Sequence, residues 1–150
     1  MTVETVVSVV DARKGFETGE VLHGITFSVA KGETLVIMGG SGSGKTLTLR
    51  LIAGLIRPDS GEIRVFGTSI EGLTEEELLP IRRRMGYVFQ GAALFDSLSV
   101  YENVAFPLRE HHRLGERGIR ERVQRNLALV GLGEDVLPLL PAELSGGMKK

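Results

Sequence analysis

The sequence predicts an α/β domain that combines a mostly parallel sheet with an N-terminal antiparallel β subdomain and a helical subdomain. Short apolar runs of strand length alternate with helical patterns in the first half of the chain, and glycines lie between them. Helical patterns dominate from Tyr101 to Leu132. With 42% hydrophobic residues among 150, the chain has enough apolar material for a globular core.

The N-terminal part predicts an antiparallel hairpin followed by a central strand. Residues 5–11 and 21–29 are rich in Val, Ile and Phe, and turn-prone residues lie between them at 17–20. Residues 34–38 (TLVIM) form a continuous apolar run, which is typical of a strand buried on both faces of a sheet. We therefore expect a central strand at residues 33–38.

Beyond a glycine-rich loop, the pattern predicts further alternation of helices and strands. Residues 47–55 fit a helix with a broad apolar face that ends near residues 57–61. Residues 62–66 predict a strand, and residues 74–84 predict a helix with Thr74 at its N-cap and three glutamates in its first turn. Residues 86–89 predict another strand.

Residues 92–140 predict the helical subdomain. Four apolar side chains recur at spacings of four, four and three, which places them on one face of a helix: Ile119, Val123, Leu127 and Val130. Ala92, Ala93, Leu94 and Phe95 begin this region, and they are either core residues or a groove for the helix of a partner.

Composition excludes several classes of function. The formal net charge of −1 provides no long-range attraction for polyanions, so nucleic acid is not an expected partner. The absence of cysteine excludes disulfides and Cys-ligated metal sites. No uncharged apolar run approaches the roughly 18 residues of a membrane span, and the N-terminus lacks the pattern of a secretory signal. We expect any role at a membrane to act through a partner.

Residues 39–46 match in full the phosphate-binding P-loop pattern, G-x-x-x-x-G-K-[ST]. Glycines without a Cβ let successive backbone N–H groups converge on phosphate oxygens, and the following helix adds the positive end of its dipole. A chance glycine-rich turn is the alternative, but this loop follows an apolar strand candidate and opens a helix, as a P-loop must. The predicted nucleotide-binding residues are Gly39, Gly40, Ser41, Gly42, Ser43, Gly44, Lys45 and Thr46.

Lys45 and Thr46 carry the chemistry of this loop. Lys45 is expected to be catalytic, because its ammonium group can bind the β- and γ-phosphates. The Thr46 hydroxyl is expected to ligate a Mg²⁺ ion that keeps several waters. These residues predict a P-loop NTPase core that binds a nucleotide with Mg²⁺.

Three other segments hold candidates for the same site. Ser145 is a good N-cap, and Gly146 and Gly147 leave backbone N–H groups uncovered, so this segment can form a second anion-binding helix start or an ordinary turn. Gln90 follows the strand predicted at residues 86–89, where a polar loop residue is common. Phe16 lies in the predicted hairpin, where a core role is the alternative.

These segments together resemble the ATPases of ATP-binding cassette (ABC) transporters. Residues 144–148 (LSGGM) are similar to the family's signature, usually LSGGQ, and residues 87–90 (YVFQ) are similar to its Q-loop. Phe16 lies where the family has an aromatic residue that stacks on adenine. The resemblance implies ATP and Mg²⁺ as cofactors, with Gln90 both catalytic and close to the metal.

The resemblance also implies partners. In the family, two ATPase subunits form a head-to-tail dimer, and the signature segment of one subunit closes over the nucleotide of the other. Ser145, Gly146 and Gly147 would therefore bind the nucleotide held by the opposite subunit. The region from Gln90 to Phe95 would contact an integral membrane permease, and the motion of the dimer would pass through it.

A finer resemblance concerns the transported molecule. Residues 90–95 (QGAALF), residues 100–111 (VYENVAFPLREH) and Met148 in place of the usual Gln are similar to the ATPases of bacterial phospholipid transporters. That group is the maintenance-of-lipid-asymmetry family, related to toluene-tolerance systems. It implies transport of phospholipid or another hydrophobic solute, a lipid-binding partner, and a peripheral location at the cytoplasmic face of a bacterial inner membrane.

The family pattern has further parts that this chain lacks. In ABC ATPases an aspartate and a glutamate at the end of a second apolar strand follow the signature, whereas this chain ends at Lys150. We therefore expect residues 1–150 to be a single incomplete ATP-binding domain, with the C-terminal part of the core missing and little or no ATPase activity alone. Two alternatives remain: a soluble ABC ATPase that acts on nucleic acid or ribosomes, and a non-catalytic nucleotide-binding fragment.

Overall fold

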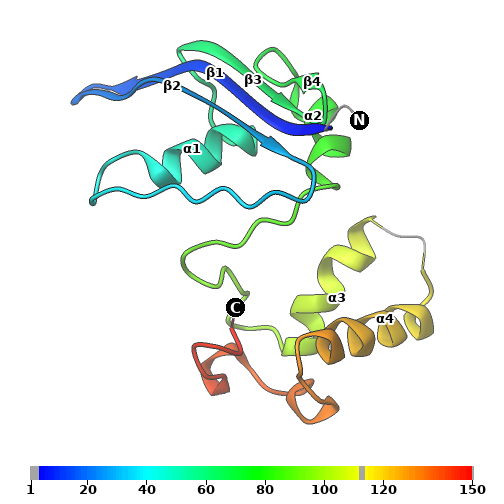
Figure 1. Cartoon of the computed structure of the whole chain (residues 1–150). Helices are drawn as coiled ribbons and strands as arrows, with labels where there is room; N and C mark the ends of the chain where they lie inside the picture. The colour runs from blue at the N-terminus through cyan, green and yellow to red at the C-terminus, as the bar shows by residue number, and fades with distance from the viewer. Residues whose placement is uncertain (1–3, 112–113, 150) are drawn as a thin grey trace. The chain divides into compact units, whose positions relative to one another are not determined.

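The computed structural model describes residues 4–111 and 114–149. The chain divides between Tyr87 and Val88 into two compact units, each with its own apolar core (Figure 1). The first unit holds a sheet and two helices, and the second is helical.

The sheet of the first unit is antiparallel throughout. Strands β1 (Thr5–Phe16) and β2 (Gly19–Ala30) form a long hairpin, and β1 pairs on its other side with β3 (Ser60–Val65), which pairs with the short β4 (Thr68–Ser69). The strand order is β2-β1-β3-β4. The predicted N-terminal hairpin is confirmed, and its strands run further than the apolar pattern indicated.

Two helices complete the first unit. Helix α1 (Lys45–Ile52) follows the glycine-rich loop, and α2 (Glu75–Arg82) begins at the predicted Thr74 N-cap, where Thr74 and Glu77 form a capping box. Their apolar faces join the sheet in one core, whose fully buried side chains include Val9, Leu51, Ile63 and Val65. At typical values, each such aliphatic side chain contributes about 1.5–3 kcal/mol through burial.

The expectation of a mostly parallel sheet is wrong for the described part of the chain. Residues 33–38 and 86–89 form no strand there, and the side chains of Val36 and Met38 are 69% and 85% exposed. A strand exists only where a neighbouring strand pairs with its N–H and C=O groups. Strands β1 to β4 pair with one another and not with residues 33–38. The apolar character of residues 33–38 therefore indicated a segment suited to burial, but it did not identify a strand with which the segment pairs.

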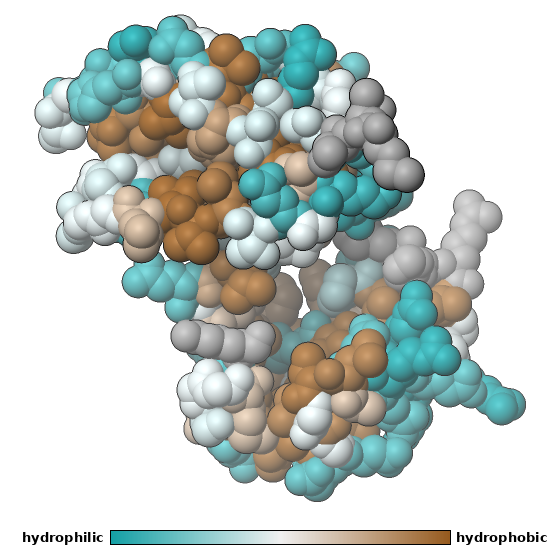
Figure 2. Space-filling model, viewed as in Figure 1, coloured by the Kyte–Doolittle hydropathy of each residue, from teal (hydrophilic) through white to brown (hydrophobic). Residues whose placement is uncertain are grey.

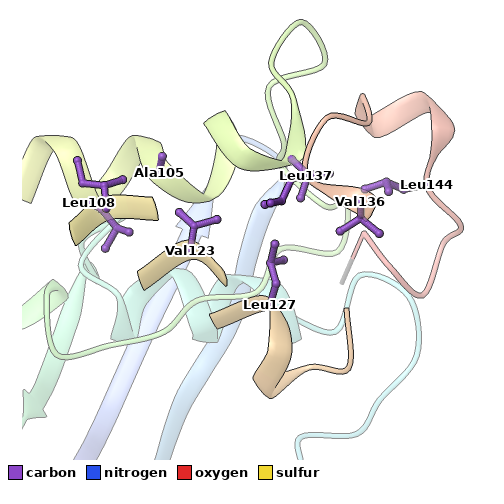
Figure 3. Packing of buried hydrophobic residues seen from close by; sticks show 9 residues of the cluster. Ala105, Leu108, Val123, Leu127, Val136, Leu137 and Leu144 are labelled. Atoms are coloured by element: carbon purple, nitrogen blue, oxygen red, sulfur yellow. The ribbon is translucent and has the colours of Figure 1, made fainter. Parts of the chain in front are cut away.

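The second unit is built on two helices. Helix α3 (Val100–His111) packs against α4 (Glu116–Leu129), and two single 3₁₀ turns, η1 (Glu134–Val136) and η2 (Pro141–Glu143), close the core. Figure 3 shows Ala105 and Leu108 of α3 facing Val123 and Leu127 of α4, with Val136, Leu137 and Leu144 alongside. None of the helices in the described residues is both long and apolar enough to cross a membrane.

The predicted apolar face of α4 is confirmed at three of its four positions. Ile119, Val123 and Leu127 are buried, but Val130 is 69% exposed. Val130 is the C-cap residue, with φ −105° and ψ 13°. Its backbone is no longer helical, so its side chain does not continue the buried face that includes Leu127. The bounds 92–140 for a helical subdomain, and the assignment of residues 1–150 to one incomplete domain, stay predictions.

A capping box fixes the start of α3 and allows a stability test. The Ser99 backbone N–H and hydroxyl donate to the Glu102 carboxylate at 2.7 and 2.8 Å, and the Glu102 N–H donates back to Ser99 Oγ at 3.2 Å. Ser99→Ala is expected to lower the free energy of unfolding by about 1 kcal/mol, because an orphan N–H of the first turn loses its acceptor. Urea unfolding followed by circular dichroism measures the change. Ser97→Ala, an exposed serine two residues earlier, is the control, and an equal loss in both variants would contradict the capping role.

Candidate functional site

The glycine-rich loop at residues 39–44 has a backbone that only glycine adopts easily. Gly42 and Gly44 have φ values of +78° and +86°, in the left-handed region. A Cβ on Gly44 would also lie 2.5 Å from Leu22 Cδ2 of β2. Glycine at position 44 therefore lets the loop pass close to the hairpin and turn directly into α1.

The N-terminus of α1 is suited to an anion. Gly44 is the N-cap, no side chain caps the helix, and its first turn has no acidic residue. The partial positive charge of the helix end is therefore not compensated within the helix. At the first turn, the Thr48 N–H and hydroxyl both donate to Gly44 O, at 2.8 and 3.0 Å, and fix the loop to the helix.

Lys45 folds back over the loop that precedes it. Its Nζ donates to the carbonyl oxygens of Gly39 at 2.8 Å and Gly40 at 2.6 Å, and lies 3.5 Å from Ser43 Oγ. The ammonium group is thus held among oxygen acceptors at the loop. An incoming phosphate would offer negatively charged oxygens in place of these neutral carbonyls, so that both donor and acceptor of each bond would be ionised.

The loop and Phe16 line the same cavity, of about 450 Å³. Phe16 is the last residue of β1, and its side chain is 53% exposed, so the alternative of a core residue is wrong. The sequence did not single out several other residues of the lining. Its full set is Phe16, Val21, Gly42, Ser43, Gly44, Lys45, Thr46, Leu47, Arg50 and Ile56. The cavity combines an anion-binding loop with an aromatic wall, and Arg50 adds a second cation.

The remaining loop residues and Thr46 are open to solvent. Gly39, Gly40 and Ser41 are exposed, and Thr46 lies exposed in the first turn of α1. Among the residues that the structure describes, no group of three or more His, Cys, Asp or Glu side chains is arranged to hold a metal ion. The exposed Thr46 hydroxyl is a hard oxygen donor of the kind that Mg²⁺ accepts beside phosphate and water ligands.

Asp59 anchors the strand end that carries Phe16. Its Oδ1 accepts from Lys14 Nζ at 2.5 Å, and its Oδ2 accepts from the Gly15 backbone N–H at 2.7 Å. The hydrogen bond from Lys14, followed by the one from Gly15, lowers the pKa of Asp59. The local pattern Pro-Asp-Ser-Gly is typical of a turn and carries no signal of a link to Phe16, so sequence reasoning missed this residue.

Gln90 and its neighbours belong to the second unit. Gln90 is exposed, and it does not follow a strand as predicted. The ring of Phe95, in the loop after it, lies 5.1 Å from the ring of Phe106 in α3, and both residues are about half exposed. Asn103 of α3 holds this loop, because its Oδ1 accepts from Phe95 N–H at 2.8 Å and its Nδ2 donates to Phe95 O at 3.1 Å. The roles of Gln90 in catalysis and metal binding stay predictions.

The segment at Ser145 also lies in the second unit, and residues 146–149 after it form turns and not a helix. Ser145 Oγ accepts from Met148 N–H at 3.3 Å, and Ser145 O accepts from Lys149 N–H at 3.2 Å. Leu144 is buried in the core, whereas Ser145, Gly146 and Gly147 are exposed. The geometry presents these three residues at the surface on an anchored turn.

Comparison with known proteins assigns the family. Residues 22–150 match the family model described as ABC transporter. The probable ribonucleotide transport ATP-binding protein mkl of Mycobacterium tuberculosis (strain H37Rv) is 44% identical over 137 residues, which make up 91% of this chain and 38% of the relative. The intermembrane phospholipid transport system ATP-binding protein MlaF of Escherichia coli (strain K12) is 41% identical over 150 residues, 98% of this chain and 55% of that protein. The chain therefore spans only part of the length of these relatives.

A solved structure supports the same assignment. The ATP-binding cassette MJ0796, determined as a dimer bound to ADP and Pi in a post-hydrolysis state, matches with a TM-score of 0.87 at 32% identity, over 95% of this chain and 65% of that one. The match confirms the cassette fold that the resemblance implies. The family model covers most of the chain, and the P-loop and the signature-like segment lie within the matched residues. This chain belongs to the ABC transporter family, as an ATP-binding domain.

Proposed function

We propose that the chain binds ATP with Mg²⁺ in the cavity beside Lys45. The observation that carries this proposal is that one cavity of about 450 Å³ is lined by both the phosphate loop and Phe16. The triphosphate lies in residues 39–46, with Lys45 on its terminal phosphates and the Thr46 hydroxyl on Mg²⁺. The adenine base packs on the exposed ring of Phe16.

For a cassette of the length of the relatives, the proposed function is the ATP-binding subunit of a transporter. ATP binding would close a head-to-tail dimer, with Ser145, Gly146 and Gly147 of one subunit at the nucleotide of the other, and hydrolysis would reopen it. The dimeric state of MJ0796 and the exposure of these three residues support this arrangement. Bound Mg²⁺ would neutralise charge on the transferred phosphoryl group.

The proposed partner at the membrane is an integral permease, and the proposed location is peripheral, at the cytoplasmic face of a bacterial inner membrane. The region from Gln90 to Phe95 would meet the permease, and Gln90 would also approach the metal or its water. The exposure of Gln90 and the half-exposed Phe95 ring support a contact surface here. Figure 2 shows in brown that apolar side chains reach the surface of both units.

The proposed transported molecule is a phospholipid or another hydrophobic solute, delivered with a lipid-binding partner. The likeness to MlaF, an intermembrane phospholipid transport protein, supports this. A second candidate is a ribonucleotide, supported by the similar identity to mkl. A cassette of the relatives' length, purified with its permease in detergent, separates the two candidates. Added phospholipid should raise its ATPase rate, and a rate raised only by an added ribonucleotide other than ATP would favour the second candidate.

The base-stacking role of Phe16 predicts a selective loss of affinity. Phe16→Ala is expected to weaken binding of MgATP about 5-fold to 100-fold, because stacking of a base on an aromatic ring contributes about 1–3 kcal/mol. Magnesium tripolyphosphate, which has no base, should bind unchanged. Isothermal titration calorimetry measures both affinities. Phe106→Ala, which removes another half-exposed ring in the second unit, is the control. Unchanged ATP affinity in Phe16→Ala would contradict the stacking role.

A further inference from the structure

Phe16 lies at a position that requires support. It ends β1, and its partner in the hairpin is Gly19, directly across the turn. On the other side, the pairing of β1 with β3 ends at Arg13 and Ser60, three residues before Phe16. The sheet therefore holds the tip of the hairpin from one side only. A half-exposed ring on such a tip needs another anchor if it is to stay at the cavity.

Asp59 supplies that anchor through three consecutive residues of β1. Its own N–H donates to Arg13 O at 2.9 Å, and its carboxylate accepts from Lys14 Nζ at 2.5 Å and from Gly15 N–H at 2.7 Å. These bonds continue the attachment of β1 up to the residue before Phe16. Asp59 does not line the cavity, so any influence on a ligand passes through β1.

Lys14 connects the carboxylate to the aromatic ring. Its Nζ lies 5.8 Å from the centre of the Phe16 ring, and its side chain is only 17% exposed. A cation at this distance is attracted to the ring face. Asp59 thus holds the Lys14 ammonium near the Phe16 ring. It also fixes the backbone of Gly15, the residue before Phe16, and so the position from which the Phe16 side chain extends.

We propose that Asp59 is a positioning residue for base recognition, which holds Phe16 at the cavity through the Gly15 N–H and the Lys14 ammonium. The proposal rests on the proposed binding of ATP beside Phe16. Asp59 does not touch the nucleotide and contributes nothing to the phosphate loop. Its effect is therefore confined to the part of the affinity that depends on the base.

Because the effect of Asp59 is confined to the base, its variants should bind MgATP and magnesium tripolyphosphate differently. Asp59→Ala removes both carboxylate bonds and is expected to weaken MgATP binding about 5-fold to 10-fold, a fraction of the full stacking contribution. Asp59→Asn keeps an oxygen for Gly15 N–H but loses the charge that holds Lys14, so its loss is smaller. Magnesium tripolyphosphate should bind both variants as it binds the unmodified chain. Titration calorimetry at neutral pH measures all of these affinities.

Two further variants make the test specific. Asp11→Asn removes the carboxylate that pairs with Arg13 on the same strand, at 3.2 Å, and should leave both affinities unchanged. In a Phe16→Ala background, Asp59→Ala should have no further effect on ATP binding, because the group it positions is gone. Equal losses for ATP and tripolyphosphate in the Asp59 variants, or a full additional loss in the double variant, would overturn the proposal. Failure of the unmodified chain to bind MgATP would instead overturn the proposed function, so the two failures are distinguishable.

Discussion

Lys45→Ala is expected to weaken MgATP binding by about 30-fold or more. The ammonium group is the cation that faces the loop, where it donates to Gly39 O and Gly40 O at 2.8 and 2.6 Å. In the proposed complex, bonds to negatively charged phosphate oxygens would replace them. Truncation of one partner of a close charge pair costs about 2–5 kcal/mol of binding free energy. A change of about 1.4 kcal/mol in this free energy is a tenfold change in affinity. Titration calorimetry with MgATP and with magnesium tripolyphosphate measures the change.

Two controls separate the phosphate contact from general effects of charge and folding. Lys31→Ala removes a lysine that is 72% exposed and pairs with Glu4, and it should leave nucleotide affinity unchanged. Circular dichroism should show the same helix and strand content in Lys45→Ala as in the unmodified chain. Unlike Phe16→Ala, the Lys45 variant should lose both ligands. ATP affinity within threefold of the unmodified chain would contradict a phosphate site in this loop.

Local patterns predicted those elements whose partners are close in the sequence. The hairpin β1–β2, the capping box at Thr74 and the buried face of α4 each depend on residues within a few turns or one tight loop. The strand expected at residues 33–38 depended on distant partners, and the same apolar residues do not specify what pairs with them. The pattern of residues therefore predicted helices and the hairpin well, but it did not predict which apolar segments pair into the sheet.

The candidate site was also predicted where its residues are close in the sequence and missed where they are distant. Residues 39–46 form the predicted loop before a helix, because glycine spacing and the following lysine specify a local backbone shape. The convergence of Phe16 on this loop was predicted only through resemblance to a family, since nothing near Phe16 in the sequence points to a cavity. Asp59 was missed because its partners, Lys14 and Gly15, lie more than forty positions away in the chain, at separations of 45 and 44.

Gly61 lies where the backbones of β1 and β3 approach each other closely. Its φ is +94°, and a Cβ there would lie 2.3 Å from Asp11 O and 2.6 Å from Ala12 Cα. The register of β1 against β3 shifts between Val10 and Arg13, so the bulge at residues 11–12 faces this glycine. Contacts this short are with backbone atoms, so no side-chain rotation relieves them. An added methyl group must move one strand away from the other.

Gly61→Ala is therefore expected to lower the free energy of unfolding by about 3 kcal/mol or more. The positive φ costs about 1–2 kcal/mol, and separation of the strands adds the cost of loosened packing at Ala12 and Ile63, both fully buried. Gly67→Ala is the matched control, because Gly67 has a φ of +81° in the β3–β4 turn and a Cβ there meets no atom within 4 Å. That variant should lose only about 1–2 kcal/mol.

Both variants place alanine at a positive φ, so the difference between their free energies of unfolding measures the cost of the close approach between β1 and β3 alone. Urea unfolding of both variants, measured side by side, gives this difference directly. Gly61 also follows Asp59 by two residues, so movement of β3 away from the β1 bulge should carry Asp59 away from Gly15. Gly61→Ala should then also reduce the preference for ATP over tripolyphosphate, whereas Gly67→Ala should preserve it. Equal stability in the two variants would show that β1 and β3 adjust at this point without cost, and the bulge would then have no part in holding Phe16 at the nucleotide.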